Sequence, residues 1–229
     1  VRFISGDVNR TLVNAYLLAA GMFPINENYQ AWEDELPWQP VPVHDDHRYS
    51  HTGSTKMVLG EYCPNLRWVK SCKEYNATQQ DWRLYIEYVT TNAVAPYADI
   101  HTAFGISCSL LIYASTNLTL PLWVNDTTIA QGVGFFWTLA RFLSSVPQVA
   151  RLGAGWFVGK IVKEFREAVD FNLPRKFVAH STHADNLMSA INVVAGKIPV
   201  YWPQFPSFLS FELHVLNGKQ YVEVCKLED

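Results

Sequence analysis

The chain has 229 residues, of which 49% are hydrophobic, 14% aromatic and 17% charged, a composition that is typical of globular proteins and excludes disordered and coiled-coil proteins. The formal net charge is −3, and without long basic runs the sequence offers no surface for nucleic-acid phosphates. Asn14 and Arg141 interrupt the two most apolar stretches, so neither is expected to span a membrane.

The first quarter of the chain predicts a strand, a helix and an extended segment. Val1 to Ile4 is typical of a strand, and because no initiator Met or secretory leader precedes it, we expect a further segment upstream. Asp7 is a favourable N-cap for a helix that Pro24 ends. Apolar residues follow it at helical spacing: Val8, Leu12, Ala15, Ala19 and Phe23. Alternate prolines between Pro37 and His44 then favour an extended or edge segment.

The middle of the chain, from Cys63 to Val169, is predicted to be mostly helical. Two apolar stripes at helical spacing support this, namely Ile129, Val133, Phe136, Ala140 and Leu143, and then Phe157, Ile161, Phe165 and Ala168. The charged residues opposite the second stripe, between Lys160 and Glu167, are interpreted as a face in contact with solvent.

The last quarter of the chain returns to strand patterns. Lys176 to His180 predicts a short buried strand, which a polar turn connects to a helix from Leu187 to Val194 that ends at Gly196. Two further apolar runs flank Asn217-Gly218, a pair that is a strong signal for a β-hairpin.

These patterns together predict an α/β fold, with a central mixed sheet flanked by helices and a mostly helical cap insertion. Residues 1–60 and 170–229 are expected to form the α/β core. Residues 61–169 are expected to form the cap and its flanking helices.

The cysteines and glycosylation triplets favour a protein of the secretory pathway. Four cysteines, Cys63, Cys72, Cys108 and Cys225, match no C-x-x-C spacing, so two disulfides in any of three connectivities stay open. Acceptor triplets of the type N-x-[ST] occur at Asn9, Asn76, Asn117 and Asn125, and the last three lie in turn-like sequence.

One dense cluster of reactive side chains runs from His180 to Asn186, where the predicted strand leads into a helix. Ligands of α/β folds bind beyond the carboxyl ends of the strands, and the free N–H groups at a helix start favour an anion there. A protonated His183 would hold a phosphate oxygen, and Asp185 could protonate a leaving oxygen.

Two alternatives for this cluster stay open. Asp185 or Asn186 could simply cap the helix, and capping would keep Asp185 ionised, which opposes a role as general acid. His180, His183 and Asp185 are also acceptable zinc ligands, but their H-x-x-H-x-D-N spacing departs from the H-x-H-x-D-H pattern of metallo-β-lactamase-like hydrolases. We therefore expect no metal and no cofactor.

Several segments, in order, resemble the histidine acid phosphatase family, especially its prostatic and lysosomal branch. Asp7 to Thr11 is similar to D-V-[DN]-R-T, and Trp38 to His44 is similar to W-Q-P-[IV]-P-V-H, which is the most specific piece. Asn117 to Trp123 resembles N-[FL]-T-L-P-x-W, and Lys176 to His183 resembles a strand that ends in [YH]-S-[AT]-H. The resemblance extends nearly from end to end, and it includes the closing hairpin.

The resemblance implies a histidine phosphatase-like fold and metal-free hydrolysis of phosphomonoesters through a phosphohistidine. The family's nucleophilic histidine belongs to an R-H-G-x-R-x-P motif, which this sequence does not contain, so an N-terminally truncated chain is expected. A further family arginine aligns with Ile4, and Arg2 is assigned to phosphate binding only if the loop is longer here. The second family histidine corresponds to His183. The acid that normally follows it is replaced by Ala184, so Asp185 is assigned as the acid, in a spacing known from the inositol-polyphosphate branch.

Two functions are therefore considered. The first is an acid phosphatase whose complete form supplies the nucleophile, the fragment alone being inactive. The alternative is a catalytically decayed secreted binding or structural module on the same fold, which Ile4 and Ala184 favour.

The expected substrate is a small phosphomonoester or a phosphoprotein, and the expected location is secreted, lysosomal or extracellular. Neither a nucleic-acid partner nor a membrane span within the chain is expected. A homodimer and a membrane anchor after Asp229 are left open.

Overall fold

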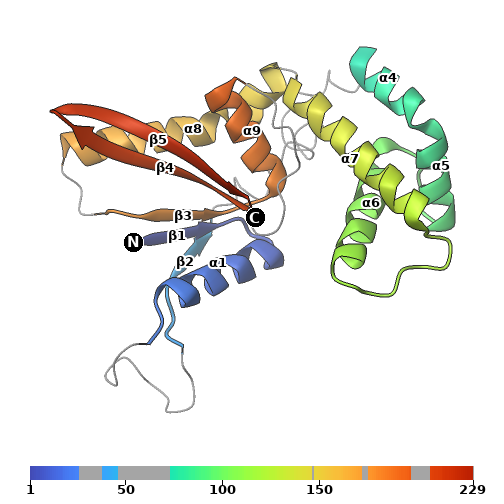
Figure 1. Cartoon of the computed structure of the whole chain (residues 1–229), viewed down its shortest axis with the longest axis horizontal. Helices are drawn as coiled ribbons and strands as arrows, with labels where there is room; N and C mark the ends of the chain where they lie inside the picture. The colour runs from blue at the N-terminus through green and yellow to red at the C-terminus, as the bar shows by residue number, and fades with distance from the viewer. Residues whose placement is uncertain (26–37, 46–72, 146, 172–174, 197–206, 229) are drawn as a thin grey trace.

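The computed structural model describes residues 1–25, 38–45, 73–145, 147–171, 175–196 and 207–228. Helices α4 to α7 lie at one end of the molecule, and a small sheet with its helix α1 lies at the other (Figure 1). The mixture of helices with small sheets confirms the α/β class.

A parallel sheet of three strands brings the start of the chain beside residues 178–181. β1 (Arg2–Ser5) lies between β2 (Val43–Asp45) and β3 (Val178–Ser181). Phe3, Ile4 and Ser5 of this central strand are at most 2% exposed. The predicted strand at the start of the chain is confirmed, and so is the edge position of the proline-rich segment, which ends in β2. The remaining residues expected in that connector, 26–37 and 46–55, lie outside the described ranges.

Helix α1 (Asn9–Met22) packs on this sheet through Thr11, Ala15 and Ala19, and it ends before Pro24 as predicted. The predicted cap was wrong: Val8 is the N-cap residue, and Asp7 precedes it. The helix begins later because a tight turn comes first, in which the Val8 N–H donates to Gly6 O at 2.9 Å. The Thr11 hydroxyl also donates to Gly6 O, at 3.0 Å, and fastens this turn to the helix.

The middle of the chain is helical, as predicted, wherever the structure describes it. The helices are α4 (Lys73–Asp81), α5 (Arg83–Asn92), α6 (Ile100–Ser115), α7 (Asp126–Ser145) and α8 (Pro147–Asp170). Helices α4 to α7 have their own aromatic core, which includes Tyr85, Phe135 and Phe142. Within this core the Tyr85 phenol lies 2.8 Å from the Ser107 hydroxyl. Burial raises the pKa of Tyr85 above 10.0, and the bond to Ser107 partly offsets this rise.

The apolar stripe predicted for α7 is confirmed only in part: Phe136 is buried and Ile129 half-buried, and the side chains of Ala140 and Leu143 lie outside the described part of the structure. Val133 is 53% exposed, whereas Phe135 and Leu139 are buried beside Phe136. Gly132 explains the difference, because a Cβ there would lie 2.9 Å from the Tyr85 Oη. The buried face of α7 thus includes a glycine, which a count of apolar residues overlooks.

The stripe predicted on α8 is confirmed. Ile161 is buried, and Phe157, Phe165 and Ala168 are half-buried. On the charged face, Lys163 pairs with Glu167 at 3.6 Å, and both are in contact with solvent.

The predicted strand, turn and helix near the end of the chain are confirmed as β3 and α9 (Ala184–Ala195). β3 begins at Val178, two residues after the expected Lys176. Helix α9 packs on α8 and ends at Gly196, whose φ of 61° is the left-handed conformation that favours glycine at a helix end.

The predicted hairpin is formed by β4 (Ser207–Leu216) and β5 (Lys219–Glu228). Asn217 and Gly218 both have positive φ, 52° and 71°, as a two-residue turn of type I′ requires. The expectation of one central mixed sheet was wrong for the described strands, because the hairpin forms a two-stranded sheet of its own. The Asn-Gly turn sets the pairing of β4 with β5 and does not determine which other strands they join.

The residues behind the secretory prediction lie in different settings. Cys108 in α6 and Cys225 in β5 are not bridged, and Cys63 and Cys72 lie outside the described residues. Asn117 lies in a turn, as expected, but Asn76 lies within α4. The Asn125 side chain accepts the Thr128 N–H at 2.9 Å at the start of α7. Among the described helices, none has the length and apolar character to cross a bilayer.

Candidate functional site

Two helices begin at the same edge of the parallel sheet. β1 leads into α1 and β3 leads into α9, and because the strands are parallel, both helix starts lie at the carboxyl edge (Figure 1). The Gly6 N–H also donates to Ser181 O at 3.4 Å, which joins the two strand ends. The first N–H groups of a helix have no partner within it, so two helix starts side by side form an anion-attracting edge.

Ser181 ties this edge together. Its hydroxyl donates to Thr11 O at 2.7 Å and accepts from the Asn14 amide at 2.9 Å, so the end of β3 is fastened to α1. Ser181 and Thr11 are 5% and 3% exposed, so water does not compete for the bond between them. The turn that carries His183 is therefore held in place from α1.

His183 is the N-cap residue of α9, with extended backbone and a half-buried ring. Its Nδ1 lies 3.4 Å from an Nη of Arg10, in the first turn of α1. A guanidinium can only donate, so Nδ1 accepts in this contact and Nε2 carries the proton. Arg10 and His183 thus place two groups that can donate to an anion at the shared helix edge.

Of the two residues that the sequence offered as caps, Asn186 takes part, as the third residue of α9 in a capping box with the N-cap residue His183. Its Oδ1 accepts from the Thr182 hydroxyl at 2.7 Å and from the His183 N–H at 3.3 Å. Asp185 is the second residue of α9, and its side chain lies outside the described part of the structure. Its role as acid stays a prediction, and the helix start has a cap without it.

His180, the other histidine of the polar cluster, lies in β3 and packs edge-on against Phe157 of α8, with ring centroids 5.2 Å apart. This contact favours a packing role for His180 and leaves His183 as the residue at the sheet edge. Among the described side chains, neither histidine belongs to a group of three metal ligands.

The structure does not bring Arg2 to His183. Arg2 begins β1 and pairs with Val178, and its N–H donates to Phe177 O at 3.0 Å. It therefore lies at the amino edge of the sheet, three residues or about 10 Å along the strand from the edge that holds His183. The structure puts Arg10 at that edge instead. The sequence contained one signal for it, because Arg10 lies in the D-V-N-R-T segment at a predicted helix start.

A surface hollow of about 560 Å³ lies elsewhere, between the end of α6 and the start of α7. It is lined by Ala114, Asn117, Leu118, Leu120, Asp126, Ile129 and Ala130. Its walls are mostly apolar, with a single carboxylate and no cation, so it does not suit an anionic ligand.

Comparisons with known proteins relate the chain to acid phosphatases. Prostatic acid phosphatase of Rattus norvegicus is 27% identical over 232 residues, covering 96% of this chain and 59% of that protein. The Bos taurus enzyme is 25% identical over 236 residues, covering 96% and 58%. Lysosomal acid phosphatase of Homo sapiens is 27% identical over 207 residues, covering 86% and 48%.

No protein-family model matches the chain. The chain spans about half the length of the curated relatives that it matches. The resemblance to the acid phosphatases is confirmed as a similarity, because the two prostatic acid phosphatases match 96% of these 229 residues at 25–27% identity.

Proposed function

We propose that this protein is an acid phosphatase that hydrolyses phosphomonoesters, with the phosphate held at the edge where α1 and α9 begin. The observation that carries the proposal is the contact of Arg10 with His183, 3.4 Å apart, at two adjoining helix starts. Helix N–H groups and cationic side chains are the groups that bind phosphate oxygens in proteins. The similarity to acid phosphatases supports the same substrate class.

The proposed reaction forms and then hydrolyses a phosphohistidine. A histidine of the R-H-G-x-R-x-P type, from outside these 229 residues, attacks phosphorus as the bond to the leaving oxygen breaks, and Asp185 donates its proton to that oxygen. Water then attacks the phosphohistidine and gives a proton to the Asp185 carboxylate, which releases phosphate and restores both groups. Arg10 and His183 stabilise the charge on the transferring phosphoryl group.

The test uses a form of the protein that carries the nucleophile motif, assayed at acid pH. Asp185→Asn should lower kcat about 10²–10⁴-fold with an alkyl phosphate, and less with p-nitrophenyl phosphate, whose leaving group needs little protonation. Asp170→Asn, at the exposed end of α8, is the matched control and should keep the rate. Equal rates for Asp185→Asn and the parent with both substrates would remove Asp185 from the mechanism.

A decayed binding module is the second candidate, and one observation favours it. Ile4 occupies the position of a family arginine, and it is 2% exposed within the central strand. An arginine could not replace it there without burying its charge. If the motif-bearing form binds inorganic phosphate but hydrolyses neither substrate, the binding module is the correct description.

The proposed location is the secretory pathway, as a secreted or lysosomal protein. The names of the relatives, prostatic and lysosomal acid phosphatase, support it.

A further inference from the structure

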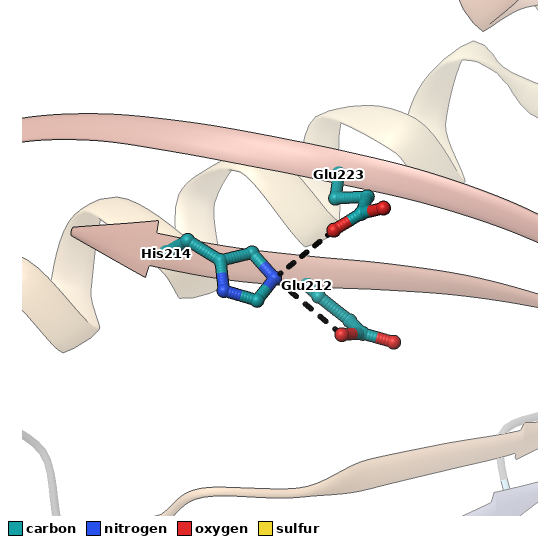
Figure 2. Close-up of side chains that lie close together, drawn as sticks. All are labelled: Glu212, His214 and Glu223. Atoms are coloured by element: carbon teal, nitrogen blue, oxygen red, sulfur yellow. Dashed lines mark ion pairs between the residues drawn. The ribbon is translucent and has the colours of Figure 1, made fainter. Parts of the chain in front are cut away.

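Three side chains that can bind metal ions meet on one face of the hairpin. Glu212 and His214 are two residues apart on β4, so they share a face, and Glu223 on β5 lies directly opposite Glu212. Figure 2 shows the imidazole between the two carboxylates. All three side chains are about half exposed, at 53%, 49% and 61%, so an ion could reach them from solvent. They belong to a different sheet from the site at β3 and α9.

The two distances from the imidazole to the carboxylates fit one metal ion. The His214 Nε2 lies 3.4 Å from a Glu212 oxygen and 3.5 Å from a Glu223 oxygen, and all three atoms lie within 4.8 Å of one another. Direct hydrogen bonds between charged groups are shorter, about 2.7–2.9 Å. Two ligands bound at about 2.1 Å to one tetrahedral zinc ion lie about 3.4 Å apart.

Neighbouring residues hold the other oxygen of each carboxylate. The Ser210 hydroxyl donates to Glu212 Oε1 at 3.2 Å, and the Cys225 thiol donates to Glu223 Oε1 at 3.5 Å. The Oε2 atoms are the ones that face His214. Hydrogen bonds of this kind orient the ligating oxygens in metal sites.

The pairing of Glu212 with Glu223 is unfavourable without a cation. Two carboxylates directly opposite each other in an antiparallel ladder repel, and a single imidazole, even when protonated, leaves a net negative charge on the group. A divalent ion bound to two carboxylates and a neutral imidazole makes the group electrically neutral. The ion would also link β4 to β5, because its ligands come from both strands.

We propose that Glu212, His214 and Glu223 form a site for one divalent transition-metal ion, with zinc as the best match. Imidazole with carboxylates is a ligand set that zinc accepts, whereas magnesium and calcium bind oxygen ligands. A water molecule would complete the four ligands. The ligands come from both strands of the hairpin, so a bound ion would hold β4 and β5 together.

The test is calorimetric titration of the 229-residue chain with zinc at neutral pH, with cobalt as a spectroscopic substitute. The chain should bind one ion, show the visible absorption of tetrahedral cobalt, and unfold at a higher temperature with zinc than without it. His214→Ala and Glu223→Gln should each weaken binding at least about tenfold. His101→Ala, a change at an exposed histidine of α6, is the matched control and should bind like the parent.

The variant Cys225→Ser tests whether the metal binds to the thiol instead of to the three proposed ligands. It should bind metal with an affinity close to that of the parent chain. Its cobalt spectrum should show no bands from a sulfur ligand. All four side chains are exposed, and circular dichroism confirms the fold of each variant. Absence of zinc binding by the parent chain would overturn the proposal. Unchanged binding by His214→Ala, or loss of binding only in Cys225→Ser, would overturn it as well.

Discussion

Replacing Arg10 tests which of two arginines, Arg2 or Arg10, binds phosphate. The resemblance to the phosphatase family assigned Arg2 to phosphate, whereas the structure brings Arg10 to His183 and leaves Arg2 at the opposite edge of the sheet. Both residues are arginines near the start of the chain, so Arg2→Ala is a matched control for Arg10→Ala. The two variants remove the same charge from the protein.

The expected magnitude follows from the exposure of the guanidinium. A hydrogen bond to a charged group contributes about 1.5–3 kcal/mol, and Arg10 is exposed, so screening by water and salt favours the lower value. Because about 1.4 kcal/mol is a factor of ten in Kd, Arg10→Ala should weaken phosphate binding about tenfold. Arg10→Lys keeps the charge but loses the forked donor, so its loss should be smaller.

The assay is titration of the 229-residue chain with inorganic phosphate at low ionic strength, followed by phosphorus NMR or calorimetry. Arg2→Ala should bind phosphate like the parent chain. Added salt should weaken binding by the parent more than binding by Arg10→Ala, because the variant has lost one cation. Tenfold weaker binding by Arg2→Ala, with Arg10→Ala unaffected, would refute the assignment of the site to the edge that holds His183.

Two further predictions concern the fold. Asn14→Ala removes one hydrogen-bond partner of the buried Ser181 hydroxyl, so it should lower the free energy of unfolding by about 1–3 kcal/mol, measured by urea denaturation. An unchanged urea midpoint would show that Asn14 does not fasten the end of β3 to α1. The pKa of Tyr85 is raised in the folded state, so its stability contribution is present below pH 10.0 and is lost as pH rises through the folded pKa. From about pH 8 to about pH 11, the parent and Tyr97→Phe, a change at a 68% exposed side chain, should therefore lose more stability than Tyr85→Phe. Equal losses would contradict burial as the cause of the shift.

Local signals predicted the elements well. Helix α9 has a glycine at its end, the hairpin has its Asn-Gly turn, and α1 stops before a proline, and each of these acts within a few residues. The apolar stripe of α8 was also predicted correctly, because its buried and half-buried residues recur at simple helical spacing. The stripe of α7 was predicted only in part, because the face that packs on Tyr85 contains Gly132, which allows a close approach and adds no apolar side chain.

The candidate site was predicted only in part. The segment with His183 was found because a polar cluster between a strand and a helix is visible in the sequence. Arg10 was missed because the sequence does not show that α1 and α9 begin at the same edge of the sheet. The parallel pairing of β1 with β3 brings the two helix starts together. The Glu212, His214 and Glu223 group was missed although the Asn-Gly turn at 217–218 already sets its pairing.

The pairing of β1 with β3 also affects when the protein can fold during synthesis. Ser181 bonds to Thr11 across 170 positions of sequence, so β1 has no neighbour on that side until the segment with β3 has left the ribosome. At about 5–20 residues per second, that delay is about 10–30 s. Helices α4 to α7 have an aromatic core of their own and can form in the meantime. During that delay the β3-facing edge of β1 is exposed to chaperones and to unwanted pairing.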